Sequence, residues 1–434
     1  MSLTFAGAVA TIEAMYQAAL SAADPRIAVR DALSIDEDGI SVAGHHVDLS
    51  GRLVVIAVGK AAVTMAQGAI DAVGDRIDAG IAITKDGHVG NAVLPRFAIY
   101  EAGHPIPDER GVAATRNALD LATSCGRGDI VLALISGGGS ALFEAPRPPI
   151  SLQDLAEMTG LLLKAGAPIE DLNVARTSLS QVKAGGLLRA AGSATVATLM
   201  LSDVLGNDPA VIASGPTVPG GATNGRARAV LERYGLWEQV SESIRVALQA
   251  PDPDAGAARA GVLEIVADNQ KAVAAADEKA RELGLRSQMI WREATGEARD
   301  RARSWVDACQ HAGDDVDCLL GGGEFTVTVH GDGIGGRNTE FVLAAAIELG
   351  ERKIDDWGIA SLATDGQDGP TNVAGALAGA QLVARARASG IDPYAALARN
   401  DSLPAVRAGG TVLDPGPTGT NVNDLYVAIR MRAI

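Results

Sequence analysis

The segment Asp129–Leu142, with the sequence DIVLALISGGGSAL, joins an apolar run directly to a run of glycines. The run Ile130–Ile135 is hydrophobic at every position. This predicts a strand covered on both faces, as in the parallel sheet of an α/β protein. The next residues are Ser136, Gly137, Gly138, Gly139 and Ser140. Glycines let backbone N–H groups approach an anion, and the flanking hydroxyls can add hydrogen bonds. The loop is therefore either a phosphate site or a flexible strand exit that binds nothing.

Length and composition narrow the class of protein. The chain has 434 residues, enough for two domains with ample cores, and its net charge is −16. That charge disfavours a surface for nucleic acid or for anionic membrane. No apolar run approaches the roughly 20 residues of a membrane span, and the N-terminus lacks the basic region of a signal peptide. Three cysteines, widely spaced, fit a reducing compartment, so we expect a cytoplasmic protein without a zinc site.

The first part of the chain alternates apolar strands with helices. Besides Ile130–Ile135, strands are expected at Leu53–Val58, Ala79–Thr84, Phe97–Glu101 and Ala194–Leu201. Helices are expected at Ala61–Val73, Gly111–Ser124 and after Ser151, which with Asp154 resembles a capping box. This alternation predicts a doubly wound parallel sheet within a domain that spans residues 1–250.

Polar residues stand at the exits of three of these strands. Lys60 follows the first strand and opens a helix, the glycine loop follows Ile135, and Asp203 follows Leu201. In a parallel sheet these exits share one edge, where ligands collect, so the groups are expected to converge. An acid in this position suits a general base or a metal ligand. The alternatives are a solvated lysine and a helix N-cap.

The segment NVARTSLSQVKAGG contains a second group of polar residues. Asn173, Arg176, Ser180 and Lys183 recur at spacings of three and four, which places them on one face of a predicted helix. Two cations beside donors and acceptors could clamp an anion. The same stripe is also typical of the solvated side of a helix, although the break at Ala184–Gly186 favours the functional interpretation.

After a linker at residues 251–260, a smaller α/β domain with a mixed sheet is expected over residues 261–434. Its strands are expected at Gly261–Ala267, Arg286–Trp291, Asp317–Leu320, Phe325–Val329, Trp357–Ala363 and Leu425–Arg430. Its helices are expected at Lys271–Leu283, Ala298–Ala312 and Glu340–Leu349.

The segment Gly331–Gly336 matches the pattern GxGxxG between a predicted strand and a predicted helix, so a dinucleotide site and hydride transfer must be considered. Two features oppose this interpretation: the preceding strand alternates, and Arg337 follows the last glycine directly. A guanidinium at a helix N-terminus suits a transferring phosphoryl group. The chain has no P-loop, protein-kinase, HExxH or GxSxG signature. The sequence has glycine loops with a lysine, an arginine and carboxylates at strand ends. These groups are typical of phosphoryl-transfer sites.

Several motifs resemble one known family, the type II glycerate kinases, whose C-terminal domain is called MOFRL. They are VGKAA from residue 58, GHPIPDE from Gly103, LISGGGSAL, LSDVLGND from Leu201, IASGPT, GGE from Gly322, GGRN, TDGQDGPT and GPTGTNVNDL. They occur in order from near Leu53 to Asp424. The resemblance implies phosphorylation of D-glycerate at its 2-hydroxyl by ATP with magnesium. It also implies a Rossmann-like N-terminal domain and a site between the domains.

Carried over residue by residue, the resemblance assigns catalysis to Lys60, Asp203 and Arg337. Lys60 and Arg337 would neutralise charge on the γ-phosphate, and Asp203 would orient or deprotonate the 2-hydroxyl or hold Mg²⁺. The nucleotide and its metal are expected to contact Ser136, Gly137, Gly138, Gly139, Ser140, Asn173, Lys183, Asp208, Glu324, Asp365, Asp368, Thr418 and Asn421. The partners are then ATP and a small hydroxy acid, and a homodimer is compatible with the sequence.

Three departures from the family pattern leave the substrate open. The family's RxHLSxxKGG reads RTSLSQVKAG from Arg176, Thr339 replaces a glutamine, and Asn372–Val373 replace aspartate and alanine. A related hydroxy acid such as tartronate or tartrate remains an alternative. Some family members carry the name hydroxypyruvate reductase, which keeps NAD(P)H-dependent reduction open as a second function. A non-catalytic sensor of a small acid is the third.

Overall fold

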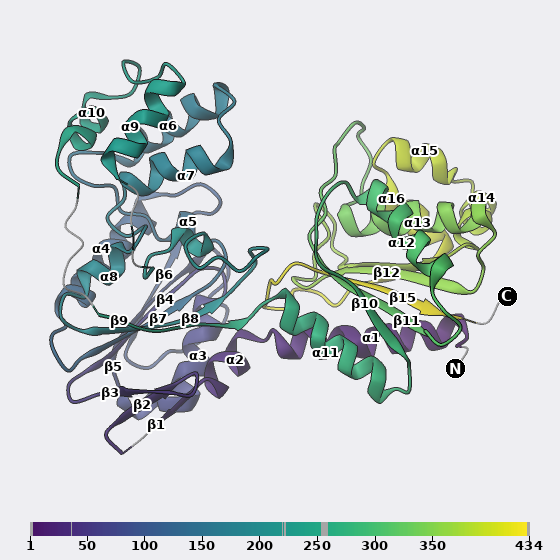
Figure 1. The fold of residues 1–434 in the computed structure, drawn as a ribbon, viewed down its shortest axis with the longest axis horizontal. Coiled ribbons are helices and arrows are strands. Elements are labelled where there is room, and N and C mark those ends of the chain that lie inside the picture. The colour runs from purple at the N-terminus through teal and green to yellow at the C-terminus, as the bar shows by residue number, and fades with distance from the viewer. Residues whose placement is uncertain (1–2, 36, 219, 221–222, 253–258, 432–434) are drawn as a thin grey trace. The chain divides into compact units, whose positions relative to one another are not determined.

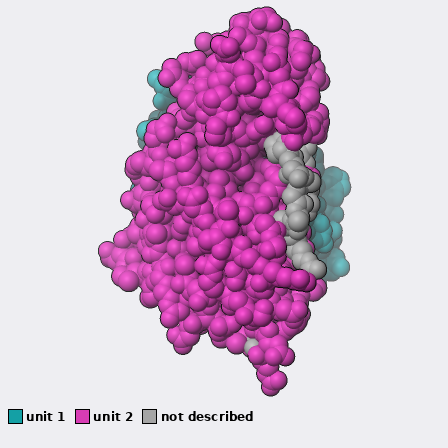
Figure 2. All heavy atoms as spheres, turned by 90° about the vertical axis from the view of Figure 1, so that its left-hand side faces the viewer, with its two compact units in different colours: residues 1–24, 267–434 teal, residues 25–266 magenta. Residues whose placement is uncertain are grey.

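The computed structural model describes residues 3–35, 37–218, 220, 223–252 and 259–431. The chain forms two compact units, coloured separately in Figure 2. Unit 1 comprises residues 1–24 and 267–434, and unit 2 comprises residues 25–266.

Unit 2 is built on a six-stranded sheet in the order β6-β5-β4-β7-β8-β9. Counted along the chain within this sheet, the order is 3-2-1-4-5-6, that of the doubly wound Rossmann fold, which confirms the predicted fold class. The ladders from β6 to β8 are all parallel. The strands are β4 Leu53–Val58, β5 Ile77–Lys85, β6 Phe97–Ala102, β7 Ile130–Ile135, β8 Thr195–Leu201 and β9 Arg259–Ala267.

Helices cover both faces of this sheet, which explains why β4 and β7 are buried at every residue. Figure 1 shows α3 (Ala62–Val73) below the sheet and α4 (Glu109–Thr123) with α8 (Gly186–Ala190) above it. The alanines of α4 and the apolar residues of α8 share one core with the upper face of the strands. A small antiparallel sheet of β1 (Leu33–Ile35), β2 (Gly39–Val42) and β3 (His45–Asp48) and the helix α2 (Pro25–Asp31) complete this part.

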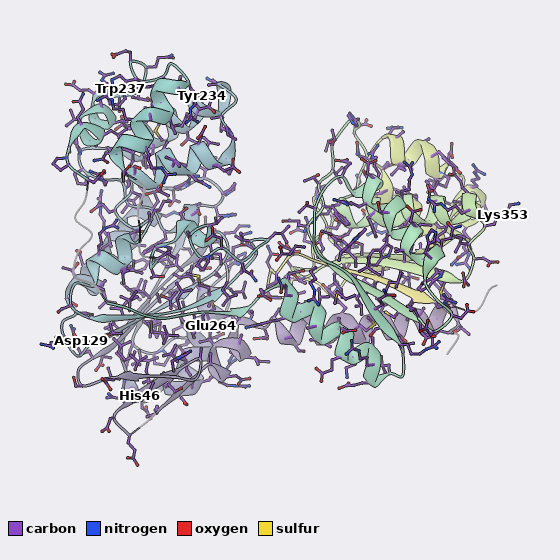
Figure 3. All side chains as sticks on the ribbon, viewed as in Figure 1. His46, Asp129, Tyr234, Trp237, Glu264 and Lys353 are labelled. Atoms are coloured by element: carbon purple, nitrogen blue, oxygen red, sulfur yellow. The ribbon has the colours of Figure 1, made fainter. Side chains whose placement is uncertain are left out.

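Four further helices of unit 2 form a separate lobe with its own core. They are α6 (Leu152–Lys164), α7 (Ile169–Ser178), α9 (Asn224–Arg233) and α10 (Glu242–Gln249). The capping box of Ser151 and Asp154 is present, as predicted. Tyr234 and Trp237, labelled in Figure 3, lie in this lobe, where the hydroxyl of Tyr234 donates a hydrogen bond of 2.8 Å to Asp171.

Unit 1 contains a mixed sheet in the order β10-β11-β15-β12-β13-β14, in which only the β10–β11 ladder is parallel. The strands are β10 Ser287–Ala294, β11 Cys318–Gly323, β12 Trp357–Ala363, β13 Gly375–Gly379, β14 Thr411–Leu413 and β15 Asp424–Arg430. The helices are α1 Phe5–Ala22, α11 Asn269–Glu282, α12 Ala298–His311, α13 Arg337–Arg352, α14 Leu382–Ala388, α15 Pro393–Ala398 and α16 Ser402–Gly409. Figure 1 shows α1 and α11 below the sheet and α12, α13 and α16 above it.

The compact units depart from the expected domain boundaries at two places. Helix α1 belongs to unit 1, because its buried face packs there and the hydroxyl of Tyr16 donates a hydrogen bond of 2.6 Å to the carbonyl of Ala363. Strand β9, expected to open the second domain, extends the sheet of unit 2 beside β8. A single strand pattern does not reveal which sheet it joins.

The predicted strand Phe325–Val329 is wrong. Within it, only Thr326 forms a β-bridge, to Glu297, and Phe325 instead packs on the buried Tyr426 with the ring centroids 4.3 Å apart. The three cysteines are buried and free. Of the helices in the described residues, none has the length and apolar character needed to cross a membrane.

Candidate active site

The adjacent strands β4 and β7 of unit 2 end at the point where the strand order reverses, the usual ligand position in this fold. Val58 pairs with Ile135, so the residues after each strand meet. The N–H of Lys60 donates to the carbonyl of Gly137 at 2.9 Å. The hydroxyl of Ser136 accepts from the N–H of Ala61 at 3.1 Å and donates to the carbonyl of Val58 at 3.2 Å. Ser136 thus fixes the two strand exits and is buried.

Asp203, which follows β8, lies directly against the glycine loop. A Cβ at Gly137 would come within 2.1 Å of Asp203 Oδ2, so the carboxylate occupies space that only glycine leaves free. Burial raises the pKa of Asp203, and the nearby positive charge of Lys60 partly opposes this shift. Within the described residues, no salt bridge and no hydrogen bond from another side chain engages Asp203. Its carboxylate is therefore available to a ligand.

Gly138 adopts a left-handed conformation with φ of 83°. A Cβ there would lie 3.1 Å from Lys60 Cγ and 3.2 Å from Nε2 of His104, which follows β6. Burial, followed by the charge of Lys60, lowers the pKa of His104 below its usual value of about 6.5, so the imidazole is neutral at pH 7. The structure thus brings Lys60, Asp203 and His104 together around the loop. His104 is not among the residues predicted for the site, although it occupies the exit of a predicted strand.

The far end of the loop is held by a buried ion pair. Lys183 Nζ donates a hydrogen bond of 2.8 Å to the carbonyl of Ser140 and pairs with Glu144, and the two side chains are 1% and 2% exposed. Burial lowers the pKa of Lys183, which the charge of Glu144 opposes. Among the described residues, none gives a hydrogen-bond partner to Glu144 Oε1.

The predicted cationic face of one helix is wrong. Helix α7 ends at Ser178, so Ser180 and Lys183 lie beyond it, and Lys183 faces the protein interior. Its pairing with Glu144 could not be predicted, because the sequence shows Glu144 only as an acidic residue after an apolar segment.

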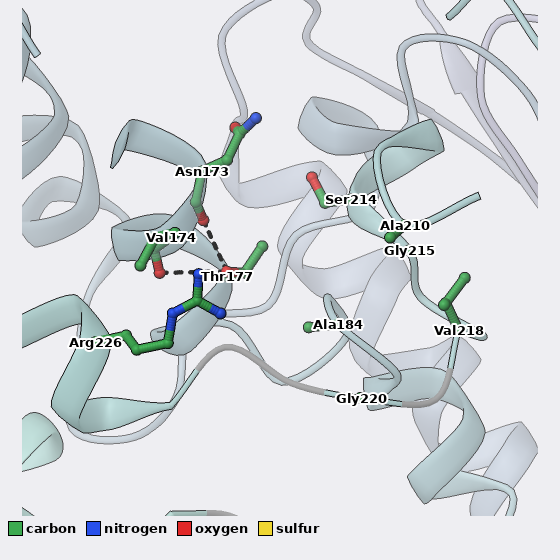
Figure 4. A pocket seen from close by; sticks show the side chains of 10 residues that line it. All are labelled: Asn173, Val174, Thr177, Ala184, Ala210, Ser214, Gly215, Val218, Gly220 and Arg226. Atoms are coloured by element: carbon green, nitrogen blue, oxygen red, sulfur yellow. Dashed lines mark hydrogen bonds between the residues drawn. The ribbon is translucent and has the colours of Figure 1, made fainter. Parts of the chain in front are cut away.

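A cavity of about 240 Å³ lies between α7, the start of α9 and the segment after β8. Asn173, Thr177, Ser214 and Arg226 supply its polar lining (Figure 4). The hydroxyl of Ser214 makes a hydrogen bond of 2.8 Å with that of Ser140. Asp208 is outside this lining, exposed, and caps a turn by accepting from the N–H of Ala210 at 2.9 Å.

Unit 1 carries a second charged group, centred on Arg337 at the start of α13. Its Nε and Nη2 donate to the two oxygens of buried Asp424 at 2.6 and 2.8 Å, and Nη2 lies 3.4 Å from Glu324. This bidentate pair fixes the plane of the guanidinium. The sequence does not predict the pairing of Arg337 with Asp424, because the two residues lie 87 positions apart.

Asp368, expected to bind the nucleotide, caps α13. Its buried carboxylate accepts hydrogen bonds from the N–H groups of Asn338 at 2.9 Å and Thr339 at 2.8 Å. These are the groups that would bind the pyrophosphate of a dinucleotide, so the GxGxxG interpretation does not hold. The glycines of the motif instead permit close packing: added Cβ atoms at Gly331 and Gly333 would lie within 2.4 Å of residues 399–401.

The remaining expected ligands in unit 1 lie in turns. Asp365 is half-buried and accepts from the N–H of Gln367 at 2.9 Å. The hydroxyl of Thr418 donates to the carbonyl of Thr364, and Asn421 accepts from the N–H of Asn423 at 3.2 Å. The described residues contain no group of three or more histidine, cysteine or acidic side chains that could hold a metal ion.

The fold and these clusters define a two-unit α/β protein with a glycine loop at its topological switch point. Two family models match the chain: the domain of unknown function DUF4147 over residues 11–249, and the MOFRL family over residues 317–424. A crystal structure of a glycerate kinase from Thermotoga maritima superposes with a TM-score of 0.86 at 37% identity, covering 96% of this chain and 98% of that one.

Curated relatives give the family its name. The D-glycerate 2-kinase of Thermotoga maritima is 40% identical over 386 residues, 87% of this chain and 90% of its own. A protein of Agrobacterium vitis, provisionally named a hydroxypyruvate reductase, is 39% identical over 423 residues, 95% of this chain and 92% of its own. The chain belongs to the glycerate kinase family.

Proposed function

We propose that this protein transfers the γ-phosphoryl group of ATP to the 2-hydroxyl of D-glycerate, giving 2-phosphoglycerate and ADP. The observation that carries the proposal is the placement of Lys60 and Asp203 on the two glycines Gly137 and Gly138, at the switch point of a doubly wound sheet. Phosphoryl transfer to an alcohol needs a cation, a carboxylate and backbone N–H groups close together, and here they meet at one edge of the sheet. Membership of the glycerate kinase family supports the choice of acceptor.

Lys60 is assigned to the charge that develops on the transferring group. Its ammonium has no salt bridge or hydrogen-bond partner within the described residues, so its charge is available to a ligand. The hydrogen bond from its own N–H to Gly137 ties the lysine to the loop that would hold the phosphates. The backbone of Lys60 is therefore held at the loop, and its flexible side chain extends from that fixed point to supply the positive charge that stabilises the transition state.

Asp203 is assigned to the acceptor hydroxyl. The carboxylate takes the proton of the 2-hydroxyl as the new O–P bond forms, and the bond between the γ-phosphorus and the bridging oxygen breaks to release ADP. The raised pKa of Asp203 makes it a stronger base than an exposed aspartate, and the charge of Lys60 favours its ionised form. Neutral His104 lies with Lys60 at Gly138 and can donate one hydrogen bond to a phosphate or carboxylate oxygen.

Magnesium is compatible with this donor set. Mg²⁺ is commonly held by one or two carboxylates together with substrate phosphates and water, so a single free carboxylate suffices. Holding the ion would be the alternative role of Asp203 to that of base, and the bound ion would neutralise charge on the β- and γ-phosphates.

Arg337 is proposed as the second cation of the reaction. Asp424 holds its guanidinium in a fixed plane, and Nη2 of Arg337 also lies 3.4 Å from the exposed Glu324. The arginine remains 20% exposed at the start of α13, so an edge of the guanidinium can reach a phosphate oxygen.

A paired assay tests the proposal. One reaction contains D-glycerate with Mg·ATP, and the other contains hydroxypyruvate with NAD(P)H, the alternative suggested by the name of the Agrobacterium vitis relative. We expect ADP release in the first reaction and no loss of nicotinamide absorbance in the second. Reduction of hydroxypyruvate without ADP release would replace the kinase by a reductase. Activity in neither reaction would reject both and favour a binding protein.

A further inference from the structure

The cavity beside α7 begins where the glycine loop ends. The hydroxyl of Ser214, which lines the cavity, is hydrogen-bonded to that of Ser140, the last residue of the loop. Lys60 and Asp203 contact the loop at Gly137 and Gly138 instead. The loop therefore runs from the reacting groups at one end to the cavity at the other.

The direction of the loop decides which part of a ligand binds at each of its ends. In the proposed reaction the γ-phosphate and the acceptor hydroxyl meet at Lys60 and Asp203. A triphosphate that runs along the loop from Gly138 towards Ser140 points its other end at Ser214. Between these residues, the N–H of Gly139 donates to the carbonyl of Ser136 at 3.4 Å. The part of ATP that reaches the cavity is then the nucleoside.

The lining suits a neutral heterocycle. The amide of Asn173 offers a donor and an acceptor, which matches the edge of a base. Val174 and Val218 supply apolar surface for its faces, and exposed Arg226 is the charged member of the lining (Figure 4). The volume of about 240 Å³ is more room than a three-carbon acid fills.

We infer, on the basis of the proposed kinase function, that this cavity binds the purine nucleoside end of the phosphoryl donor. Asn173 reads the edge of the base, and Val174 and Val218 pack on the ring. Asn173 thereby becomes a specificity residue for the nucleotide, whereas glycerate is bound elsewhere.

A cavity-filling substitution separates the two substrates. Val174→Trp places an indole in the cavity, whereas Ile169→Trp places one on the same helix at an exposed position outside the lining. We expect Val174→Trp to raise KM for ATP by about tenfold or more with KM for D-glycerate unchanged, because only nucleotide contacts are lost. Ile169→Trp should behave as wild type. A rise in KM for D-glycerate alone, or no change in either, overturns the inference.

A measurement on the unaltered protein covers the case in which Val174→Trp fails to fold. Irradiation of wild-type protein with 2-azido-ADP, followed by peptide mapping, should label residues 173–177 or 210–218, and excess ADP should abolish the label. Label confined to other peptides overturns the inference. Protein that is labelled here but inactive with D-glycerate and ATP retains the nucleoside site while refuting the proposed function, so the two failures are distinguishable.

Discussion

The buried pair of Lys183 and Glu144 supports a prediction about stability and loop position. Glu144→Gln removes the negative charge and leaves an ammonium that is 1% exposed without its counter-ion. Breaking a buried pair in this way costs about 3–5 kcal/mol of stability. We expect unit 2 to be destabilised by that amount, and Lys183→Met to cost a similar amount because a carboxylate is then buried alone.

The double variant Glu144→Leu/Lys183→Met should be milder than either single variant. It removes both charges, and its main loss is the hydrogen bond from Lys183 to the carbonyl of Ser140. An unsatisfied buried acceptor costs about 1–3 kcal/mol, so the double variant should lie in that range. With Glu144→Leu as the matching single variant, single effects of about 4 kcal/mol each and a double effect of about 2 kcal/mol correspond to a coupling energy of about 6 kcal/mol between the two side chains.

The pH dependence of Glu144→Gln follows from the same pair. Burial already lowers the pKa of Lys183, and loss of Glu144 lowers it further. Between the lowered folded pKa and the unfolded value of about 10.4, the unfolded chain binds the extra proton. The stability of Glu144→Gln relative to wild type should therefore rise as pH increases towards 10.

Hydrogen exchange with mass spectrometry measures these effects within unit 2, through opening free energies of peptides from residues 136–145 and 179–190. Wild type and an exposed-site variant, Glu157→Gln on α6, serve as references. Two results would refute the reasoning: single variants within about 1 kcal/mol of wild type, or a double variant no more stable than the singles.

Three further predictions concern single residues. Lys60→Ala should lower kcat by about two to four orders of magnitude, because the charge of Lys60 acts in the transition state. Lys164→Ala, on the exposed side of α6, should leave kcat unchanged. Steady-state ADP release measures both variants, and normal turnover of Lys60→Ala would exclude the role. Asp203→Asn should abolish turnover yet stabilise unit 2 near pH 7. Because burial raises the folded pKa of Asp203, the free energy of unfolding of the wild type falls as pH rises from the unfolded pKa to the folded pKa, and the variant avoids this loss. The gain should vanish below about pH 3.9, where Asp203 is protonated in both states, and urea titrations at pH 3.5 and 7 test this. Asp368→Ala should destabilise unit 1 by about 1–3 kcal/mol by leaving N–H groups of α13 unpaired, with loss of tryptophan fluorescence at lower urea; unchanged stability would mean that the carboxylate is not a structural cap.

The sheet of unit 2 could be predicted from sequence because its strands carry a local signal. The uninterrupted apolar runs at Leu53–Val58 and Ile130–Ile135 fix buried strands, and parallel topology then places Lys60, the glycine loop and Asp203 at one edge. His104 lies at the same edge but was not selected, since a single histidine in a loop gives no periodic pattern.

Other candidate residues depend on contacts that no local pattern encodes. Asp368 and Asp424 look alike in sequence, as acids in glycine-rich loops, yet one caps α13 and the other binds Arg337. Lys183 resembles a solvent-facing cation until the end of α7 at Ser178 turns it inward onto Glu144. Helix α1 packs in unit 1 although more than 240 residues separate it from the rest of that unit.

Phosphorus-31 NMR of a reaction containing D-glycerate, Mg·ATP and the full chain tests the central claim most directly, because the spectrum reports both phosphoryl transfer and the position of the new ester. We predict that the γ-phosphate signal of ATP is replaced by those of ADP and 2-phosphoglycerate, and that the Lys60→Ala protein leaves the ATP spectrum unchanged over the same time. A 3-phosphoglycerate signal would contradict the assigned acceptor hydroxyl, and an unaltered ATP spectrum with wild-type protein would contradict phosphoryl transfer to D-glycerate.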